Sequence, residues 1–414
     1  MRVSAENAPA PNAGILRDGI NLRNEYTSDI IGGMQIIPIA SGKGGVGKSL
    51  LSANLAIALG QTGKKVIIAD LDLGSSNLHL VIGQKASKTG IGTFLTGQTS
   101  FEELVQPTDY ENVRFIAGDS EIPGLTSLKV SQKNDLVRHF TKLDADYLIL
   151  DLGAGTHLTI LDMFLLSPQG IVVTAPTVTA TLNGYLFLKN VVFRMMYNTF
   201  RKGSAAYKYL ETLKTDSASL QRLYIPKLIE TLEQKDPEST ALLKKRMHEF
   251  HPRLVMNMID DPKDAEKANK IRHSCQQYLG LDIEHLGVIY RDTMQDKALS
   301  SRLPVVVYKP QAIISQAIYR IAEKIMQSET LTFDDAYDIT KASDTSFEIA
   351  TEEAADDFGQ KMAYVEELAG SGVLSAGELA EVLKQQQYEM TQLRAENNLL
   401  KKKLVEAAAQ GFKV

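Results

Sequence analysis

Short apolar segments recur along the chain and predict the strands of a buried sheet. Several of them, residues 147–150 for example, are apolar without alternation, which is typical of parallel strands buried on both faces. Stretches with helical periodicity lie between most of these segments, from residue 34 to about residue 328. That order predicts an α/β fold with a doubly wound, mostly parallel sheet and right-handed crossovers. The predicted strands are residues 36–40, 65–69, 113–117, 147–150, 171–174, 253–256 and 285–289.

One part of this region has helical patterning and no clear strand. We interpret it as a helical insertion between two strands, at about residues 190–250. Its helix candidates include residues 207–213 and 220–232, and Pro226 is expected to break or restart the second of them. The basic run Lys244-Lys245-Arg246 is expected to be a solvated face. A nucleic-acid site is the alternative, but three charges are few for one.

The two ends of the chain differ from the central α/β region, residues 33–328. Residues 1–32 are polar and are expected to form a flexible leader, with a short docking helix around Leu16 as the alternative. Residues 329–375 carry many acidic and few basic side chains, so we expect an acidic linker with short helices. Residues 376–414 carry a heptad seam, which predicts a C-terminal coiled coil. The seam positions are Leu379, Leu383, Gln386, Met390, Leu393, Asn397, Leu400, Leu404 and Ala407.

The seam has the features of a parallel, two-stranded coil. Asn397 falls at an a position, where a buried amide favours a paired, in-register dimer. Opposite charges fit the flanking g and e positions, as in Glu396 with Lys401. Two alternatives stay open, a single solvated helix packed on its own domain and a basic amphipathic helix lying on a membrane.

Composition limits the classes of function. The 414 residues carry a formal net charge of −5, which disfavours nucleic-acid binding by the whole molecule, although a local basic patch stays open. The single cysteine, Cys275, excludes a disulfide framework and an iron–sulfur cluster held by this chain alone, and it is expected to be a packed side chain. No signal peptide or membrane-spanning run is visible. We therefore expect a cytoplasmic protein whose membrane contact would be peripheral.

The residues that carry the chemistry follow the first predicted strand. They match the pattern G-x-x-x-x-G-K-[ST] in full and stand between an apolar strand and a helix with one apolar face. Glycines let backbone N–H groups turn towards phosphate oxygens, and the helix N-terminus adds partial positive charge. Lys48 is expected to reach the β- and γ-phosphates of ATP, and the Ser49 hydroxyl is expected to ligate Mg²⁺. The matching residues are Gly42, Lys43, Gly44, Gly45, Val46, Gly47, Lys48 and Ser49.

A second lysine inside the loop, Lys43, makes this segment resemble the deviant Walker A motif of the MinD/ParA family of P-loop ATPases. The resemblance covers about residues 34–326. It implies slow ATP hydrolysis and a homodimer that closes around bound nucleotide. It also implies that Lys43 reaches the phosphates of the partner subunit, where a cation can act as an arginine finger does. Within the family the chain looks most like the MinD-like branch, and FlhG-like flagellar-number regulators are the members to compare first.

Further segments match the motifs of this family in chain order. Asp72 follows a strand and resembles the switch I carboxylate that orients water against the γ-phosphate, whereas Asp70 stays open between a site role and a structural one. Asp151 ends an apolar strand in the Walker B form and is expected beside Mg²⁺. Gly153, just beyond it, stands where the family often has proline. Asn257 resembles the strand-end residue that recognises adenine, since an amide offers both a donor and an acceptor.

The resemblance favours an ATP-switched positioning protein, acting on flagellar number or placement or on cell division. Its ATP-bound dimer would engage a membrane or a partner at the membrane or cell pole, and hydrolysis would release it. The expected partners are a second copy of the chain and an activating or cargo protein. Two alternatives stay open: a ParA-type DNA-segregation ATPase, against which the acidic balance counts, and a nucleotide-dependent scaffold with little turnover. The lone cysteine argues against a metal-cluster carrier.

Overall fold

The structure is a computed structural model that describes residues 33–74, 76–118, 128–214, 224–328 and 339–370, together with Leu400 and Lys403. The chain divides after Ala355 into two compact units. The predicted leader over residues 1–32 lies outside the described residues. The predicted coiled coil over residues 376–414 does so too, apart from Leu400 and Lys403, which are helical.

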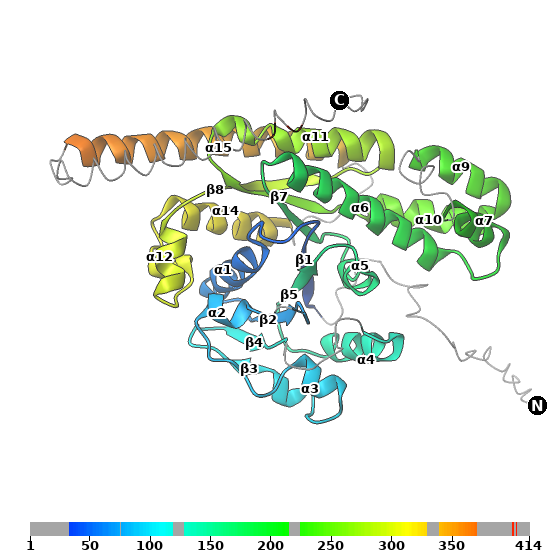
Figure 1. Ribbon diagram of the computed structural model, residues 1–414, viewed down its shortest axis with the longest axis horizontal. Helices are drawn as coiled ribbons and strands as arrows, with labels where there is room; N and C mark the ends of the chain where they lie inside the picture. The colour runs from blue at the N-terminus through cyan, green and yellow to red at the C-terminus, as the bar shows by residue number, and fades with distance from the viewer. Residues whose placement is uncertain are drawn as a thin grey trace, which may run out of the picture. The chain divides into compact units, whose positions relative to one another are not determined.

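An eight-stranded sheet forms the centre of the first unit (Figure 1), with the strand order β3-β4-β2-β5-β1-β6-β7-β8. The strands are β1 Gln35–Ser41, β2 Val66–Leu71, β3 Gln106–Pro107, β4 Val113–Ile116, β5 Tyr147–Ala154, β6 Ile171–Thr174, β7 Arg253–Ile259 and β8 Glu284–Tyr290. All neighbours pair in parallel except β3, which is antiparallel to β4. The predicted parallel sheet is confirmed. The short strand β3 escaped prediction because its two residues form no apolar run.

Helices cover both faces of the sheet. The bounds outside the insertion are α1 Lys48–Gln61, α2 Leu78–Ile82, α3 Ile91–Leu95, α4 Val130–Phe140, α5 Leu158–Phe164, α11 Lys267–Ser274, α12 Met294–Ser300, α13 Val305–Tyr308, α14 Ile313–Ser328 and α15 Ile339–Gly370. Helices α1, α2, α13 and α14 share one core with alternate residues of the strands, and α5 and α6 (Val178–Thr199) also contact β1. Each fully buried Leu or Ile in this core contributes about 1.5–3 kcal/mol. Among the described residues, no helix is both long and apolar enough to cross a bilayer.

The predicted helical insertion lies between β6 and β7. Its described helices are α6 Val178–Thr199, α7 Ala205–Lys214, α9 Ile225–Lys235 and α10 Pro237–Glu249. Pro226 lies in the first turn of α9, where its missing N–H and fixed φ suit a helix start. The proline therefore lies at the start of this helix, which agrees with the prediction that Pro226 breaks or restarts a helix here. Residues 215–223, which include the start of the predicted 220–232 helix, lie outside the described residues.

The acidic segment differs from the prediction. Instead of a linker with short helices over residues 329–375, the described part from residue 339 forms one continuous helix, α15. Its buried residues within the first unit recur at helical spacing, and they are Ser343, Phe347, Ala350 and Ala354. Because most of these buried residues are small or polar, they form only a weak apolar pattern in the sequence. The surrounding acidic residues made that pattern hard to recognise. The acidic composition describes the solvated face of this helix.

Candidate functional site

The loop between β1 and α1 packs too closely against its neighbours to carry side chains at two of its glycines. A Cβ atom at Gly47 would lie 2.2 Å from the Asn257 Nδ2 atom, and Gly47 has a φ of 84°. A Cβ atom at Gly42 would lie 2.0 Å from the backbone oxygen of Asn183 on α6. Substitution at either position would force the loop away from β7 or α6. The glycine pattern of the predicted phosphate-binding loop is therefore required by local packing as well as by phosphate binding.

Helix α1 begins in a way that suits an anion. Its N-cap is Gly47, no side chain caps its first turn, and that turn contains no acidic residue. The orphan N–H groups and the helix dipole make such an end favourable for negative charge. A lysine in this turn, Lys48, is unfavourable for the dipole unless an anion lies nearby. The local chemistry thus fits a phosphate group.

The lysine of this turn already contacts one anion, the carboxylate of Asp151 at the end of β5. Lys48 Nζ lies 2.9 Å from Asp151 Oδ1, and both side chains are buried. Ser52 Oγ, one turn further along α1, donates to the same oxygen at 2.9 Å. Ser49 lies beside this group, 3.4 Å from Lys48 Nζ. The structure therefore brings Lys48, Ser49 and Asp151 together. It also adds Ser52 to this group, a residue that belongs to no motif in the sequence.

The two aspartates of the switch I segment have different surroundings. Asp70 is fully buried and accepts hydrogen bonds from Ser76 Oγ, from the Asp72 N–H and from the Leu78 N–H. Burial and the nearby charge of Asp151 raise the pKa of Asp70 to about 6, against the lowering effect of these hydrogen bonds. Asp70 thus holds the loop that carries Asp72. Of the two roles that the sequence left open for Asp70, these contacts favour the structural one.

Asp72 itself is only partly buried, and its carboxylate faces the chain just beyond Asp151. A Cβ atom added at Gly153 would lie 3.3 Å from Asp72 Oδ1, which is a tight contact. A glycine at this position therefore leaves room for the carboxylate, and this explains how the departure from the family's proline fits the fold. The two predicted switch segments meet at Asp72 and Gly153.

Asn257 lies under the loop and supports it. Its Nδ2 atom donates to the backbone oxygen of Val46 at 2.8 Å, and its Oδ1 atom accepts from the N–H of Met258. The adenine role suggested by resemblance stays a prediction. The geometry adds a second role, since one amide hydrogen bond fastens β7 to the phosphate-binding loop.

We expect Asn257→Ala to weaken nucleotide binding without unfolding the protein. Loss of the amide leaves the buried Val46 carbonyl without this donor, which costs about 1–3 kcal/mol. Calorimetric titration should show a loss of affinity of roughly 5- to 30-fold for a cost near 1–2 kcal/mol. Inorganic tripolyphosphate, which has no base, separates the two roles. A loop-holding role weakens ATP and tripolyphosphate alike, whereas a loss confined to ATP would assign Asn257 to the base.

Lys43 lies apart from the buried group. It is exposed, and its Nζ atom contacts Thr179 Oγ1 at 3.3 Å, at the start of α6. It therefore stands at the outer rim of the loop. This position leaves its ammonium group accessible from outside the subunit.

These groups fit a magnesium nucleotide. Ser49 and Asp151 offer oxygen atoms, Lys48 and the first turn of α1 offer positive charge, and the loop offers backbone donors. Within the described part of the chain, no group of three His, Cys, Asp or Glu side chains is placed to hold a metal. A magnesium ion at this site would thus take most of its ligands from phosphate oxygens and water, as is usual for this ion.

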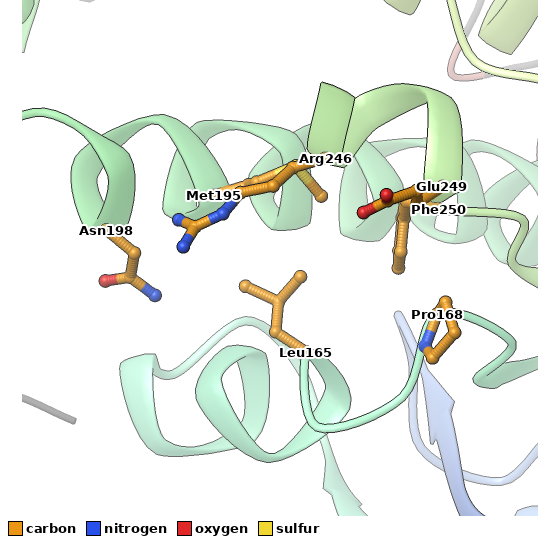
Figure 2. Close-up of a pocket in the computed structure, with 7 residues that line it drawn as sticks. All are labelled: Leu165, Pro168, Met195, Asn198, Arg246, Glu249 and Phe250. Carbon is orange, nitrogen blue, oxygen red and sulfur yellow. The ribbon is translucent and has the colours of Figure 1, made fainter. Parts of the chain in front are cut away.

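The basic run of the insertion does not form one solvated face. Lys244 and Lys245 pair with Glu233 and Glu249 at the surface, as expected. Arg246 instead is buried and donates to Thr199 Oγ1 at 3.0 Å. Figure 2 shows it reaching from α10 along a pocket whose lining also includes Leu165, Met195 and Phe250. The prediction was wrong for this residue, because helical spacing turns it towards α6.

Comparisons with known proteins place this site among P-loop ATPases. The family model described as "ParA: NUBPL iron-transfer P-loop NTPase" matches residues 33–189. The flagellum site-determining protein YlxH of Helicobacter pylori is 30% identical over 245 residues, which cover 56% of this chain and 79% of that protein. The septum site-determining protein MinD of Synechocystis is 32% identical over 148 residues, which cover 35% of this chain and 55% of that protein. The chain thus spans about half the length of this second relative.

A solved structure shows the same fold. MinD of Pyrococcus horikoshii, complexed with Mg-ADP, is 22% identical, with a TM-score of 0.50 over 72% of this chain and 98% of that one. The part of this chain left outside the match is more than a quarter of its length. Most of the first unit of this chain therefore has the same fold as that MinD structure.

Proposed function

Because this chain belongs to the MinD/ParA family of P-loop ATPases, we propose that it is an ATP-driven positioning switch. ATP closes a homodimer, the dimer engages a membrane surface or a partner protein, and hydrolysis releases it. The observation that carries the proposal is the placement of Lys43, which stands exposed at the rim of an otherwise buried phosphate-binding group. A cation in that position is available to a second copy of the chain.

The relatives favour spatial positioning as the process. Their names describe the siting of a flagellum in one case and of a septum in the other. We place this chain first with flagellar number or placement, because the match to the flagellar protein covers more of both chains. The proposed location is the cytoplasm, with peripheral contact at the membrane or cell pole.

The residues of the site divide the chemical work. Bound Mg-ATP supplies the phosphoanhydride bond and a metal that offsets its negative charge. Lys48 and the first turn of α1 would hold the phosphates, and Ser49 and Asp151 would offer oxygen atoms to the metal. Asp72 orients the attacking water, and Lys43 from the second copy neutralises charge that develops during hydrolysis. Until that lysine arrives the site is incomplete, so we expect slow basal turnover.

The assembly can be tested by analytical ultracentrifugation of the full chain and of a chain ending at residue 375. The predicted coiled coil should keep the full chain dimeric without nucleotide, and the shortened chain should be monomeric. Mg-ATP should then dimerise the shortened chain, and Lys43→Ala should bind ATP without turnover. A shortened chain that stays monomeric with Mg-ATP at micromolar concentration would contradict the switch. A full-length apo monomer would contradict only the coiled coil.

Co-sedimentation can distinguish between the surfaces that the dimer could bind. We expect Mg-ATP to carry the protein down with vesicles containing anionic lipid, or with its partner, more than Mg-ADP does. Pelleting with DNA and not with vesicles would favour the ParA-type alternative. Nucleotide-dependent assembly with no measurable turnover would favour a scaffold.

An iron-transfer role does not follow from the name of the matching family model. The only cysteine of the chain, Cys275, is buried, and burial raises the pKa of its thiol. A cluster bridging two subunits needs about two thiolates from each. The chain supplies one thiol, in a buried setting.

A further inference from the structure

The edge strand β8 is closed by the first half of α15. β8 is the last strand of the sheet, and no further strand of the described residues pairs with its outer side. Two serines of α15 bond to backbone groups at the start of this strand: Ser343 Oγ donates to the oxygen of Ile283, the residue before β8, at 2.6 Å, and the N–H of His285 donates to Ser346 Oγ at 2.9 Å. Open edges invite pairing with other chains, and covering them is a common protection. Residues 339–355, called the strap below, serve as this cover.

Further contacts fasten the strap to the sheet and to its flanking helices. Tyr290 of β8 donates its hydroxyl to the oxygen of Ala354 at 2.7 Å. Ion pairs join Glu353 to Lys324 of α14 at 2.8 Å and Asp344 to Arg272 of α11 at 2.9 Å. These polar contacts alternate along the strap with its buried Phe347, Ala350 and Ala354. The strap is a specific attachment, held at both ends.

One residue under the strap is poorly suited to its place. The His285 ring is buried with its centroid 4.9 Å from that of Phe347, and neither ring nitrogen has a hydrogen-bond partner among the described residues. Burying a polar group without a partner costs about 1–3 kcal/mol. The docked strap therefore excludes water from the His285 ring. The ring would be hydrated if the strap left the edge.

The charges around this ring do not favour its protonation. Lys324 of α14 is the charged group that acts on it directly, and it is positive. The carboxylates nearby are already engaged with basic partners, Glu353 with Lys324, Asp344 with Arg272 of α11, and Glu284 with Arg253 of β7. On the strap side the ring meets Phe347, which carries no charge. The other two carboxylates of the strap, Glu348 and Glu352, are exposed, whereas the ring is buried.

We propose that the strap docks on β8 only while His285 is neutral, and that protonation of His285 releases it and opens the edge of the sheet. Burial, followed by the charge of Lys324, lowers the pKa of His285 to about 3 in the docked state. In the released state the ring returns to its ordinary value near 6.5. Docking is thus fully stable above about pH 6.5 and weakens as the pH falls towards 3. Between about pH 7.5 and pH 5.5 the docking constant should fall about tenfold.

Release would expose backbone groups at the start of β8. The N–H of His285 and the oxygen of Ile283 would lose their serine partners and become accessible to water. The strap would also leave α14, whose Tyr319 hydroxyl contacts Gln61 at the end of α1. This inference does not depend on the proposed function, since it rests on residues away from the phosphate-binding loop.

The test is hydrogen–deuterium exchange of the full chain at about pH 7.5 and pH 5.5, corrected for intrinsic exchange rates. Protection of peptides from the strap and from β8 should fall about tenfold in the wild type. Peptides from β1, which contains no titratable side chain, serve as the internal control and should keep their protection. In His285→Leu the strap should show no such fall, because the titrating ring is gone. This pH window leaves exposed carboxylates ionised.

A second variant keeps the proposal testable if His285→Leu does not fold. Phe347→Ala should lower strap protection at both pH values and retain the tenfold ratio, because the histidine is still present. Unchanged strap protection in the wild type, or an equal fall in His285→Leu, would overturn the proposal. A fall shared by β1 would also overturn it, since that result reports general acid destabilisation.

Discussion

We expect Lys48→Ala to abolish ATP turnover and to weaken ATP binding by at least about 100-fold. The Lys48 ammonium is the buried cation at the first turn of α1, and it lies 2.9 Å from Asp151. Its removal takes away the positive charge that the phosphates need in a site shielded from water. Binding is measured by calorimetry and turnover by phosphate release.

The same substitution also leaves Asp151 in a buried place without its cation, which can destabilise the fold by about 3–5 kcal/mol. Thermal melting must therefore accompany the binding assay, and Lys48→Ala with Asp151→Asn relieves the unpaired charge. Lys65→Ala is the matched control, because Lys65 forms an ion pair with Asp144 of the same 2.9 Å length at the surface. That variant should bind and turn over ATP normally. Parental turnover in Lys48→Ala would remove Lys48 from the active site.

Local sequence patterns predicted the parts of the site that lie on single segments. The loop from Gly42 to Ser49 was predictable because its pattern occurs between a strand and a helix. Asp151 was predictable because an apolar strand ends there. These features depend on neighbours in the chain. The roles of Asp70, Ser52 and Asn257 depend on packing between β2, β5, β7 and α1, which no local pattern encodes.

The acidic segment shows the same limit at the level of the fold. Average composition predicted a linker, yet residues 339–355 dock through small side chains and single polar contacts to β8. Ser343 and Ser346 reveal their roles only where an edge strand presents unpaired backbone groups. The seven longer strands were predictable because each is an apolar run in its own right.

Asp72→Ala should retain ATP binding and lose hydrolysis by at least about 100-fold. The carboxylate is partly exposed, faces Gly153, and makes none of the contacts that hold Lys48 or Asp151. Its backbone N–H is held by Asp70, so the loop should keep its shape when the side chain is removed. The variant should therefore close on ATP and stay closed.

Sizing chromatography of the chain ending at residue 375 measures this trapped state. Asp72→Ala should elute as a dimer with Mg-ATP and as a monomer with Mg-ADP, whereas the parent should return to monomer as ATP is consumed. Asp72→Asn is the matched variant, since it keeps the size of the side chain and removes its charge. It should also be inactive if the charge orients water. Asp70→Asn provides the contrast, because a disturbed loop should weaken both binding and turnover. Hydrolysis at the parental rate in Asp72→Ala would refute the assignment, and loss of ATP binding would make Asp72 a structural residue.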